Sequence, residues 1–203
     1  MMRVKVCGIR RKEDALLAVE LGADALGFVF WPNSPRAIEP AAARAIVDAM
    51  PPFVETVGVF VNQGSDDVRR IAADARLSAV QLHGDENARD YVECAVRVIK
   101  ALPVGPGFTM AAVEGLPAEM AVLLDAHDPV RRGGTGQPIE WTVAEAAARV
   151  RPVILSGGLT PANVRQAAAT VRPFAVDVSS GVERAPGVKD ESKMRAFFAA
   201  LQS

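Results

Sequence analysis

The stretch RVKVCG, residues 3–8, alternates polar or charged residues with valines and then ends at a glycine. Strict alternation has the two-residue period of a β-strand with two different faces, so Lys5 and Cys7 point to the same side. The thiol of Cys7 therefore lies at the exit of a first strand, on the face that carries an ammonium group. A cysteine in that position is either a small buried residue or a group for acid–base or nucleophilic chemistry.

Short apolar runs like this one recur along the whole chain. They lie near residues 4–6, 25–30, 55–61, 78–82, 96–100, 120–124, 152–155 and 174–178. Stretches with helical character separate most of them, at residues 12–21, 40–50, 65–75, 139–150, 161–170 and 189–201. Strands that alternate with helices predict a parallel sheet, and eight of them predict closure into a (β/α)8 barrel.

The prediction is thus an α/β protein with a single barrel domain over residues 1–203. An open doubly wound sheet is the competing architecture, but the turn after the first strand lacks the glycine fingerprint that such a sheet normally carries there. Residues 103–117 are rich in Pro and Gly, so we expect the fifth helix to be short or missing.

Composition narrows the class of protein. The chain has 23 basic and 24 acidic residues, a net charge of −1, so no basic excess indicates a nucleic-acid partner. Its two cysteines form no disulfide framework, which favours a reducing compartment. No apolar run approaches the ~18 residues of a membrane span, and the first residues do not resemble a signal peptide. We expect a cytoplasmic protein without a membrane partner, as a monomer or a homodimer.

Polar side chains gather where the predicted strands end. In a (β/α)8 barrel the active site is built at the carboxyl ends of the strands and on the loops that follow. Core strands rarely end in many ionisable groups unless a site uses them. The strand-end residues are Cys7, Asn62, Gln81, His83, Lys100, Asp125 and Asp177, and Arg36 lies in the loop after the second strand.

Two loops are suited to a phosphate group. SGGLTP at residues 156–161 follows the seventh strand, and SSG at 179–181 follows the eighth. Thr160 is a good N-cap and Pro161 a good first helical residue, so backbone N–H groups and a helix dipole would face an anion. Phosphate-binding barrels hold their phosphate in these two loops. Plain tight turns are the alternative, but we expect a phosphorylated substrate.

The longest loop runs from residue 126 to about residue 138 and contains RRGGTG at 131–136. Because the glycines do not directly follow a strand, they make a weak nucleotide-binding motif. We interpret the loop as a flap that closes over the substrate, with an ordinary flexible loop as the alternative. Neither His83 nor His127 has a ligand partner at helical spacing, so we expect no metal and no cofactor. A thiol and a carboxylate beside a phosphate site favour proton-transfer chemistry.

Several motifs, arranged in order from end to end of the chain, carry a family resemblance. They are VKVCG (4–8), GFVF (27–30), SPR (34–36), VGVFVN (57–62), QLHG (81–84), LLD (123–125), GGTG (133–136), SGGL (156–159) and DVSSGVE (177–183). Together they resemble the phosphoribosylanthranilate isomerases, (β/α)8 enzymes of tryptophan biosynthesis. The chain departs from the family pattern at Ile139 and Glu140, where Phe and Asp are frequent, and neither position is expected to do chemistry.

The resemblance implies an Amadori rearrangement of N-(5′-phosphoribosyl)anthranilate to 1-(2-carboxyphenylamino)-1-deoxyribulose 5-phosphate. It implies that Asp125 is the general acid, that Cys7 is the general base, and that Arg36 holds the anthranilate carboxylate. Backbone N–H groups in the two phosphate loops hold the phosphate, from Gly157, Gly158, Ser180 and Gly181. The remaining substrate-binding candidates are Lys5, Gln81, His83 and Asp177.

The chemistry makes opposite demands on the two catalytic candidates. A thiol with a reference pKa near ~8.5 is only a few per cent thiolate at pH 7, so Cys7 needs help, for which Lys5 is placed. Asp125 must hold a proton near neutral pH, which burial or substrate binding favours. The alternatives are a sugar-phosphate epimerase, a histidine-pathway or bifunctional aminoaldose isomerase, and a non-catalytic barrel that senses a sugar phosphate. Histidine-pathway enzymes usually pair two aspartates, whereas here the first strand ends in a cysteine.

Overall fold

Eight parallel strands form a closed barrel in the computed structural model, which describes residues 2–91, 94, 96–126 and 140–202. The strands are β1 (Arg3–Cys7), β2 (Ala25–Val29), β3 (Glu55–Phe60), β4 (Ala79–Leu82), β5 (Arg97–Val104), β6 (Ala121–Ala126), β7 (Val153–Leu155) and β8 (Ala175–Val178). Each strand pairs with its neighbours in chain order, and β8 closes the barrel against β1. The predicted (β/α)8 fold is confirmed.

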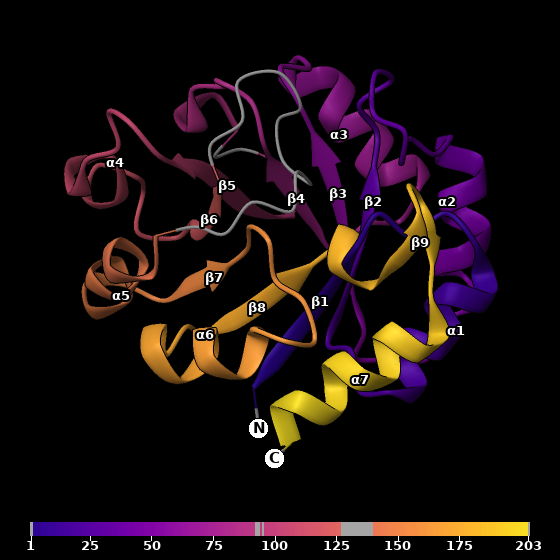
Figure 1. Ribbon diagram of the computed structural model, residues 1–203. Helices are drawn as coiled ribbons and strands as arrows, with labels where there is room; N and C mark the ends of the chain where they lie inside the picture. Colours follow the sequence, from indigo (N-terminus) through magenta and orange to yellow (C-terminus); the bar gives the residue numbers. More distant parts are fainter. Residues whose placement is uncertain (1, 92–93, 95, 127–139, 203) are drawn as a thin grey trace.

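Helices surround the strands (Figure 1). They are α1 (Lys12–Glu20), α2 (Pro40–Val47), α3 (Ser65–Asp74), α4 (Met110–Glu114), α5 (Trp141–Val150), α6 (Val164–Val171) and α7 (Glu191–Gln202), with 3-10 turns η1 (Ala88–Tyr91) and η2 (Ser180–Val182). The helix after β5, α4, has only five residues, so the expectation of a short fifth helix is confirmed. None of the helices in the described ranges is long and apolar enough to cross a membrane.

The alternation in β1 has the predicted structural consequence. Val4 and Val6 are buried in the core between the strands and the helices, whereas Cys7 packs in a separate cluster with Val29 and Val59. Another cluster, formed by inward-facing small and branched side chains, includes Val57, Ala79, Ile99, Ala101, Leu123, Ile154 and Ala175. The barrel interior is therefore a packed core, and polar groups enter it only where the site is built.

Strand β5 is longer than the predicted run at residues 96–100. It pairs with β6 as far as Val104, so Lys100 lies inside the strand and not at its end. The Lys100 ammonium donates to the carbonyl oxygen of Gly84 at 2.7 Å and lies 2.7 Å from a carboxylate oxygen of Glu86. The prediction that Lys100 is a strand-end site residue is therefore wrong; Lys100 supports the loop after β4.

A hairpin replaces the predicted beginning of the last helix. Strands β9 (Glu183–Ala185) and β10 (Val188–Lys189) pair in antiparallel fashion, and Gly187 allows the turn between them with a φ of 76°. Helix α7 begins at Glu191. Asp190 precedes it, and a carboxylate oxygen of Asp190 accepts the backbone N–H of Lys193 at 3.0 Å, as in an N-cap. The predicted start of a helix at residue 189 is wrong, and Lys189 is buried instead.

Helix α6 also begins later than predicted, at Val164. Thr160 does not serve as its N-cap; Asn163 stands at that position. The Asn163 side chain accepts the N–H of Thr160 at 2.8 Å and donates to the carbonyl oxygen of Gly158 at 2.9 Å. These two bonds shape the loop after β7, which is why a cap predicted from local preference alone was misplaced. The predicted flap at residues 126–138 lies, after Ala126, outside the described residues.

Candidate active site

A cavity of about 680 Å³ opens at the carboxyl ends of the barrel strands. The predicted catalytic and substrate-binding side chains that line it are Cys7, Arg36, Gln81, His83, Asp125 and Asp177. They come from β1, β4, β6, β8 and the loops after β2 and β4, which are far apart in the sequence and meet because the barrel closes. The structure thus brings together every predicted residue of this group except Lys5, which reaches the site indirectly.

Lys5 forms a buried ion pair with Asp177. The ammonium nitrogen lies 2.8 Å from Asp177 Oδ1, and the two side chains are 3% and 6% exposed. Burial alone would lower the pKa of Lys5, but the attraction of Asp177 and of the Cys7 thiol outweighs it and raises that pKa. Ser156 donates to the second oxygen of Asp177 at 3.3 Å. Lys5 therefore acts on the cavity through Asp177 and through the charge it places near Cys7.

The Cys7 thiol is buried among opposing charges. Burial is the largest influence and raises its pKa above the ordinary value. The ammonium groups of Lys5 and Lys189 lower that pKa, and the Asp177 carboxylate raises it. Lys5 thus acts in the predicted direction, but it does not overcome burial. The balance of these influences in the ligand-free protein therefore favours the protonated thiol.

Asp125 is the end of a hydrogen-bonded chain of three side chains. Gln81 Nε2 lies 2.8 Å from His83 Nδ1, and His83 Nε2 lies 3.2 Å from Asp125 Oδ2. The other Asp125 oxygen accepts the N–H of Ala126 at 2.9 Å. Because the Gln81 amide donates to Nδ1, a neutral His83 ring carries its proton on Nε2 and donates it to the Asp125 carboxylate. The site therefore places the carboxyl group of Asp125 beside an imidazole N–H that donates a hydrogen bond to it.

Arg36 is held against the cavity wall by Glu183, a residue that the sequence did not single out for the site. Its Nε and Nη2 donate to the two Glu183 carboxylate oxygens at 2.9 and 2.7 Å. The Arg36 side chain is 13% exposed and that of Glu183 only 4%. Burial would raise the pKa of Glu183, but its bonds to Arg36 and the charge of Lys189 outweigh burial and lower it. Acidic and basic residues in a turn-rich segment are usually solvated, so this pairing could not be predicted from the residue pattern.

A second hollow, of about 560 Å³, lies between the loops after β7 and β8. Its walls include the phosphate-loop residues Gly158, Ser180 and Gly181, together with Lys193 at the start of α7. Within the described residues, the backbone N–H of Gly158 has no hydrogen-bond acceptor, and those of Ser180 and Gly181 are the first two of the η2 turn. These free donors are what an anion requires.

The glycines of the two loops are required by close contacts. A Cβ on Gly181 would lie 1.9 Å from the carbonyl oxygen of Leu159 in the neighbouring loop. Gly157 has a φ of 85°, and a Cβ there would lie 2.7 Å from the backbone nitrogen of Ala126 at the end of β6. Gly157 therefore packs beside Asp125 and does not line the second hollow, whereas Gly158, Ser180 and Gly181 do.

Comparison with known proteins gives a consistent result. The family model described as N-(5′-phosphoribosyl)anthranilate (PRA) isomerase matches residues 4–200. An N-(5′-phosphoribosyl)anthranilate isomerase from Geobacter metallireducens is 51% identical over 197 residues, 97% of each chain. A phosphoribosylanthranilate isomerase crystallised with reduced 1-(o-carboxyphenylamino)-1-deoxyribulose 5-phosphate is 44% identical with a TM-score of 0.87, covering 100% of this chain and 99% of the other.

A further structure is that of monomers generated from the dimeric phosphoribosylanthranilate isomerase of Thermotoga maritima. It is 42% identical, has a TM-score of 0.87, and covers 100% of this chain and 99% of the other. The matches span almost the full length of the chain in both sequence and structure. With its closed barrel and its thiol and carboxylate in one cavity, the chain belongs to the PRA isomerase family.

Proposed function

We propose that Cys7 and Asp125 are the acid–base pair of this enzyme. The reaction is the isomerisation of N-(5′-phosphoribosyl)anthranilate, an aminoaldose, to 1-(2-carboxyphenylamino)-1-deoxyribulose 5-phosphate, an aminoketose, in tryptophan biosynthesis. The observation that carries the assignment is that the two groups line one cavity with Arg36. Consecutive residues, Ser179 and Ser180, join that cavity to the hollow between the phosphate loops.

Asp125 opens the sugar ring as general acid. Its proton passes to the furanose ring oxygen while the bond from that oxygen to C1′ breaks, which leaves a protonated Schiff base. The carboxylate that forms is stabilised by the Nε2–H of His83 and by the backbone N–H of Ala126. Gln81 fixes the His83 tautomer that makes this donation.

Cys7 then removes the proton at C2′ as general base. The electron pair of the C2′–H bond moves to the Schiff base and gives an enolamine, which tautomerises to the ketone. The step requires a thiolate, and the ammonium groups of Lys5 and Lys189 favour that form. One turnover leaves Cys7 protonated and Asp125 ionised, so a proton must return from the thiol to the carboxylate before the next.

Binding groups lie at both ends of the substrate. The planar fork of Arg36 suits the anthranilate carboxylate, and two of its nitrogens are already oriented by Glu183. The free N–H groups of Gly158, Ser180 and Gly181 suit the phosphate. The bound product analogue in the 44% identical relative supports a small phosphoribosyl ligand for this chain.

The test is a turnover assay with freshly generated phosphoribosylanthranilate, followed by the loss of anthranilate fluorescence. The histidine-pathway aminoaldose serves as the control substrate, because a bifunctional barrel would convert both. We expect turnover of the first substrate only, and Cys7→Ser and Asp125→Asn should each lower kcat by ~10²-fold or more. No fluorescence decay with the wild-type protein would reject the function, and near-normal turnover in either variant would reject that residue's role.

For the assembly we propose a homodimer. The Phe53 side chain is fully exposed, and its backbone φ of 71° is unusual for a bulky residue. It precedes β3 and so lies at the end of the barrel opposite the site, where a partner would leave the cavity open. The dimeric relative from Thermotoga maritima supports this assembly. Light scattering should give twice the chain mass for the wild type and the single mass for Phe53→Ser; a monomeric wild type would contradict the proposal.

We further propose that residues 1–203 act as one catalytic domain in the cytoplasm. The family match over residues 4–200 supports the single domain. The reduced thiol that Cys7 needs supports the location, because the cytosol keeps thiols reduced. Cell fractionation with an antibody against the protein tests it, and recovery from an oxidising compartment would contradict it.

A further inference from the structure

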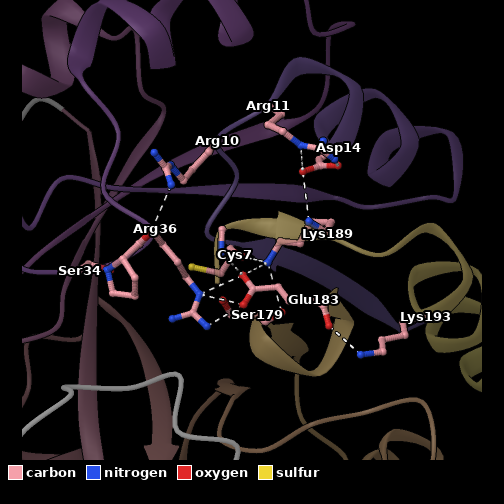
Figure 2. Close-up of polar contacts among 12 residues, drawn as sticks. Cys7, Arg10, Arg11, Asp14, Ser34, Arg36, Ser179, Glu183, Lys189 and Lys193 are labelled. Carbon is pink, nitrogen blue, oxygen red and sulfur yellow. Dashed lines mark hydrogen bonds and ion pairs between the residues drawn. The ribbon is translucent and has the colours of Figure 1, made fainter. Parts of the chain in front are cut away.

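A buried charged pair from the hairpin after β8 lies beside the cavity. Lys189 on β10 and Glu183 on β9 are 0% and 4% exposed, and the ammonium nitrogen lies 3.0 Å from Glu183 Oε1. Figure 2 shows this pair beside Cys7, with Glu183 facing Arg36. Burying two charges costs free energy unless their hydrogen bonds are well satisfied, so the hydrogen-bond partners of each side chain matter.

All three donors of the Lys189 ammonium are used within the protein. They point to the backbone oxygen of Cys7 at 2.5 Å, the backbone oxygen of Ser179 at 3.2 Å, and Glu183 Oε1. No proton of this ammonium remains for a substrate. The Lys189 ammonium therefore connects three residues of the site: Cys7, Ser179 at the start of the second phosphate loop, and Glu183.

Glu183 extends these contacts to the carboxylate-binding group. Its two oxygens accept Nε and Nη2 of Arg36, and Oε1 also accepts the backbone N–H of Gly187 at 3.2 Å. Among the described residues, nothing accepts a hydrogen bond from Arg36 Nη1. The two cations Arg36 and Lys189 share the single carboxylate of Glu183. The cluster therefore has a net positive charge, which suits a substrate that carries a carboxylate.

We propose that Lys189 and Glu183 are positioning residues: the pair fixes the guanidinium of Arg36 and the backbone of Cys7 relative to each other, so that the carboxylate of the substrate is held where the base can reach C2′. Glu183 orients the binding fork, and Lys189 connects that fork to the base. The inference rests on the proposed function, because it is the anthranilate carboxylate that Arg36 would receive.

The same ammonium also acts on the thiol. The charged side chains with the largest influence on Cys7 come from three different elements: Lys5 on β1, Asp177 on β8 and Lys189 on β10. Lys5 and Lys189 lower the pKa of Cys7, whereas Asp177 raises it. Glu183 is not among the largest influences on the thiol, so the two members of the pair should affect it to different degrees.

The test compares Lys189→Met and Glu183→Gln in a Cys94→Ala background, which leaves Cys7 as the single thiol. Lys12→Met, which removes an exposed ammonium at the start of α1, is the matched control. For each variant we would measure kcat, KM for phosphoribosylanthranilate, and the rate of Cys7 alkylation by iodoacetamide against pH. Far-ultraviolet circular dichroism and urea unfolding establish that each variant is folded.

We expect Lys189→Met to lower kcat ~10-fold or more and to move the midpoint of alkylation up by about one pH unit. Glu183→Gln should raise KM ~10-fold and move that midpoint less than Lys189→Met does, because Glu183 orients Arg36 and is not among the largest influences on the thiol. Lys12→Met should match the wild type in all three measurements. A folded Lys189→Met with the kcat and alkylation profile of the wild type would overturn the proposal.

If Lys189→Met does not fold, the double variant Lys189→Met/Glu183→Gln removes both buried charges and is the second test. It should show the raised alkylation midpoint and the raised KM together, and wild-type values for both would overturn the proposal. The alkylation profile needs no substrate, so it can fail while the turnover of the wild type stands. Absence of wild-type turnover would instead count against the proposed function.

Discussion

Replacing Asp177 with asparagine should destabilise the protein and at the same time make Cys7 more acidic. Asp177→Asn keeps the shape of the side chain and a group for the Ser156 hydroxyl, but it removes the charge 2.8 Å from the Lys5 ammonium. That ammonium is only 3% exposed, so it would remain buried without a counter-ion. Breaking a buried ion pair from one side costs about 3–5 kcal/mol.

The loss is large enough to measure by urea unfolding. With a slope of about 2–3 kcal/mol per molar urea, it would lower the unfolding midpoint by roughly 1–2 M. The double variant Lys5→Met/Asp177→Asn is the control, because removing both charges should restore most of the stability. A single variant as stable as the wild type would refute the view that the pair is tightly coupled inside the barrel.

The thiol provides the second measurement. Asp177 raises the pKa of Cys7 and Lys5 lowers it, so Asp177→Asn should shift the alkylation profile of Cys7 to lower pH. The double variant should shift it back, because it also lacks the ammonium. Both would be measured in a Cys94→Ala background. An alkylation profile that stays in place, or moves to higher pH in Asp177→Asn, would contradict the electrostatic account of this site.

Three further outcomes are expected. Gly181→Ala should raise KM ~10-fold in steady-state kinetics, because its Cβ would clash with Leu159 and displace a phosphate loop; an unchanged KM would argue against a phosphate there. His83→Asn should lower kcat ~10-fold with little change in KM, because Asp125 loses its Nε2–H partner; a change confined to KM would make His83 a binding residue. The folded-state pKa of Glu183 is lowered, so its contribution to stability is present above the unfolded value of ~4.3 and is lost as pH falls through the folded value. Glu183→Gln should therefore flatten the acid limb of the unfolding free energy measured from about pH 3 to 7, and an unchanged limb would contradict this.

The barrel and the proposed catalytic pair could be predicted from the sequence for a simple reason. Apolar runs and two-residue alternation are local signals, and in a parallel barrel every strand end contributes to the same face. The alternation of Lys5 and Cys7 therefore gave both their direction and their location, and Asp125 followed from the apolar run before it. The expectation of a short fifth helix came from a similarly local signal, the density of Pro and Gly.

Other features depend on contacts between distant segments. Lys100 was placed at a strand end because its apolar run stops there, but pairing with β6 extends the strand to Val104. Asn163 displaced Thr160 as the N-cap because its side chain also binds Gly158. Local preference cannot distinguish such cases, since both residue types are good caps.

The buried pair of Lys189 and Glu183 was the least accessible feature. Both residues lie in a segment that reads as a loop followed by a helix, where charges are normally solvated. Their burial follows from the hairpin turn at Gly187, which directs Lys189 to the backbone of Cys7 and Glu183 to Arg36. No local pattern connects residues 7, 36 and 189, because only the closed barrel brings them together.

The most direct test of the account is a substrate isotope effect on the two catalytic variants. Phosphoribosylanthranilate carrying deuterium at C2′ would be compared with the unlabelled substrate in single-turnover fluorescence assays. If Cys7 removes the C2′ proton and Asp125 opens the ring, deuterium should slow Cys7→Ser, in which proton removal limits the rate. It should leave Asp125→Asn unaffected, because ring opening then limits the rate. An isotope effect in Asp125→Asn and none in Cys7→Ser would contradict the assignment of acid and base.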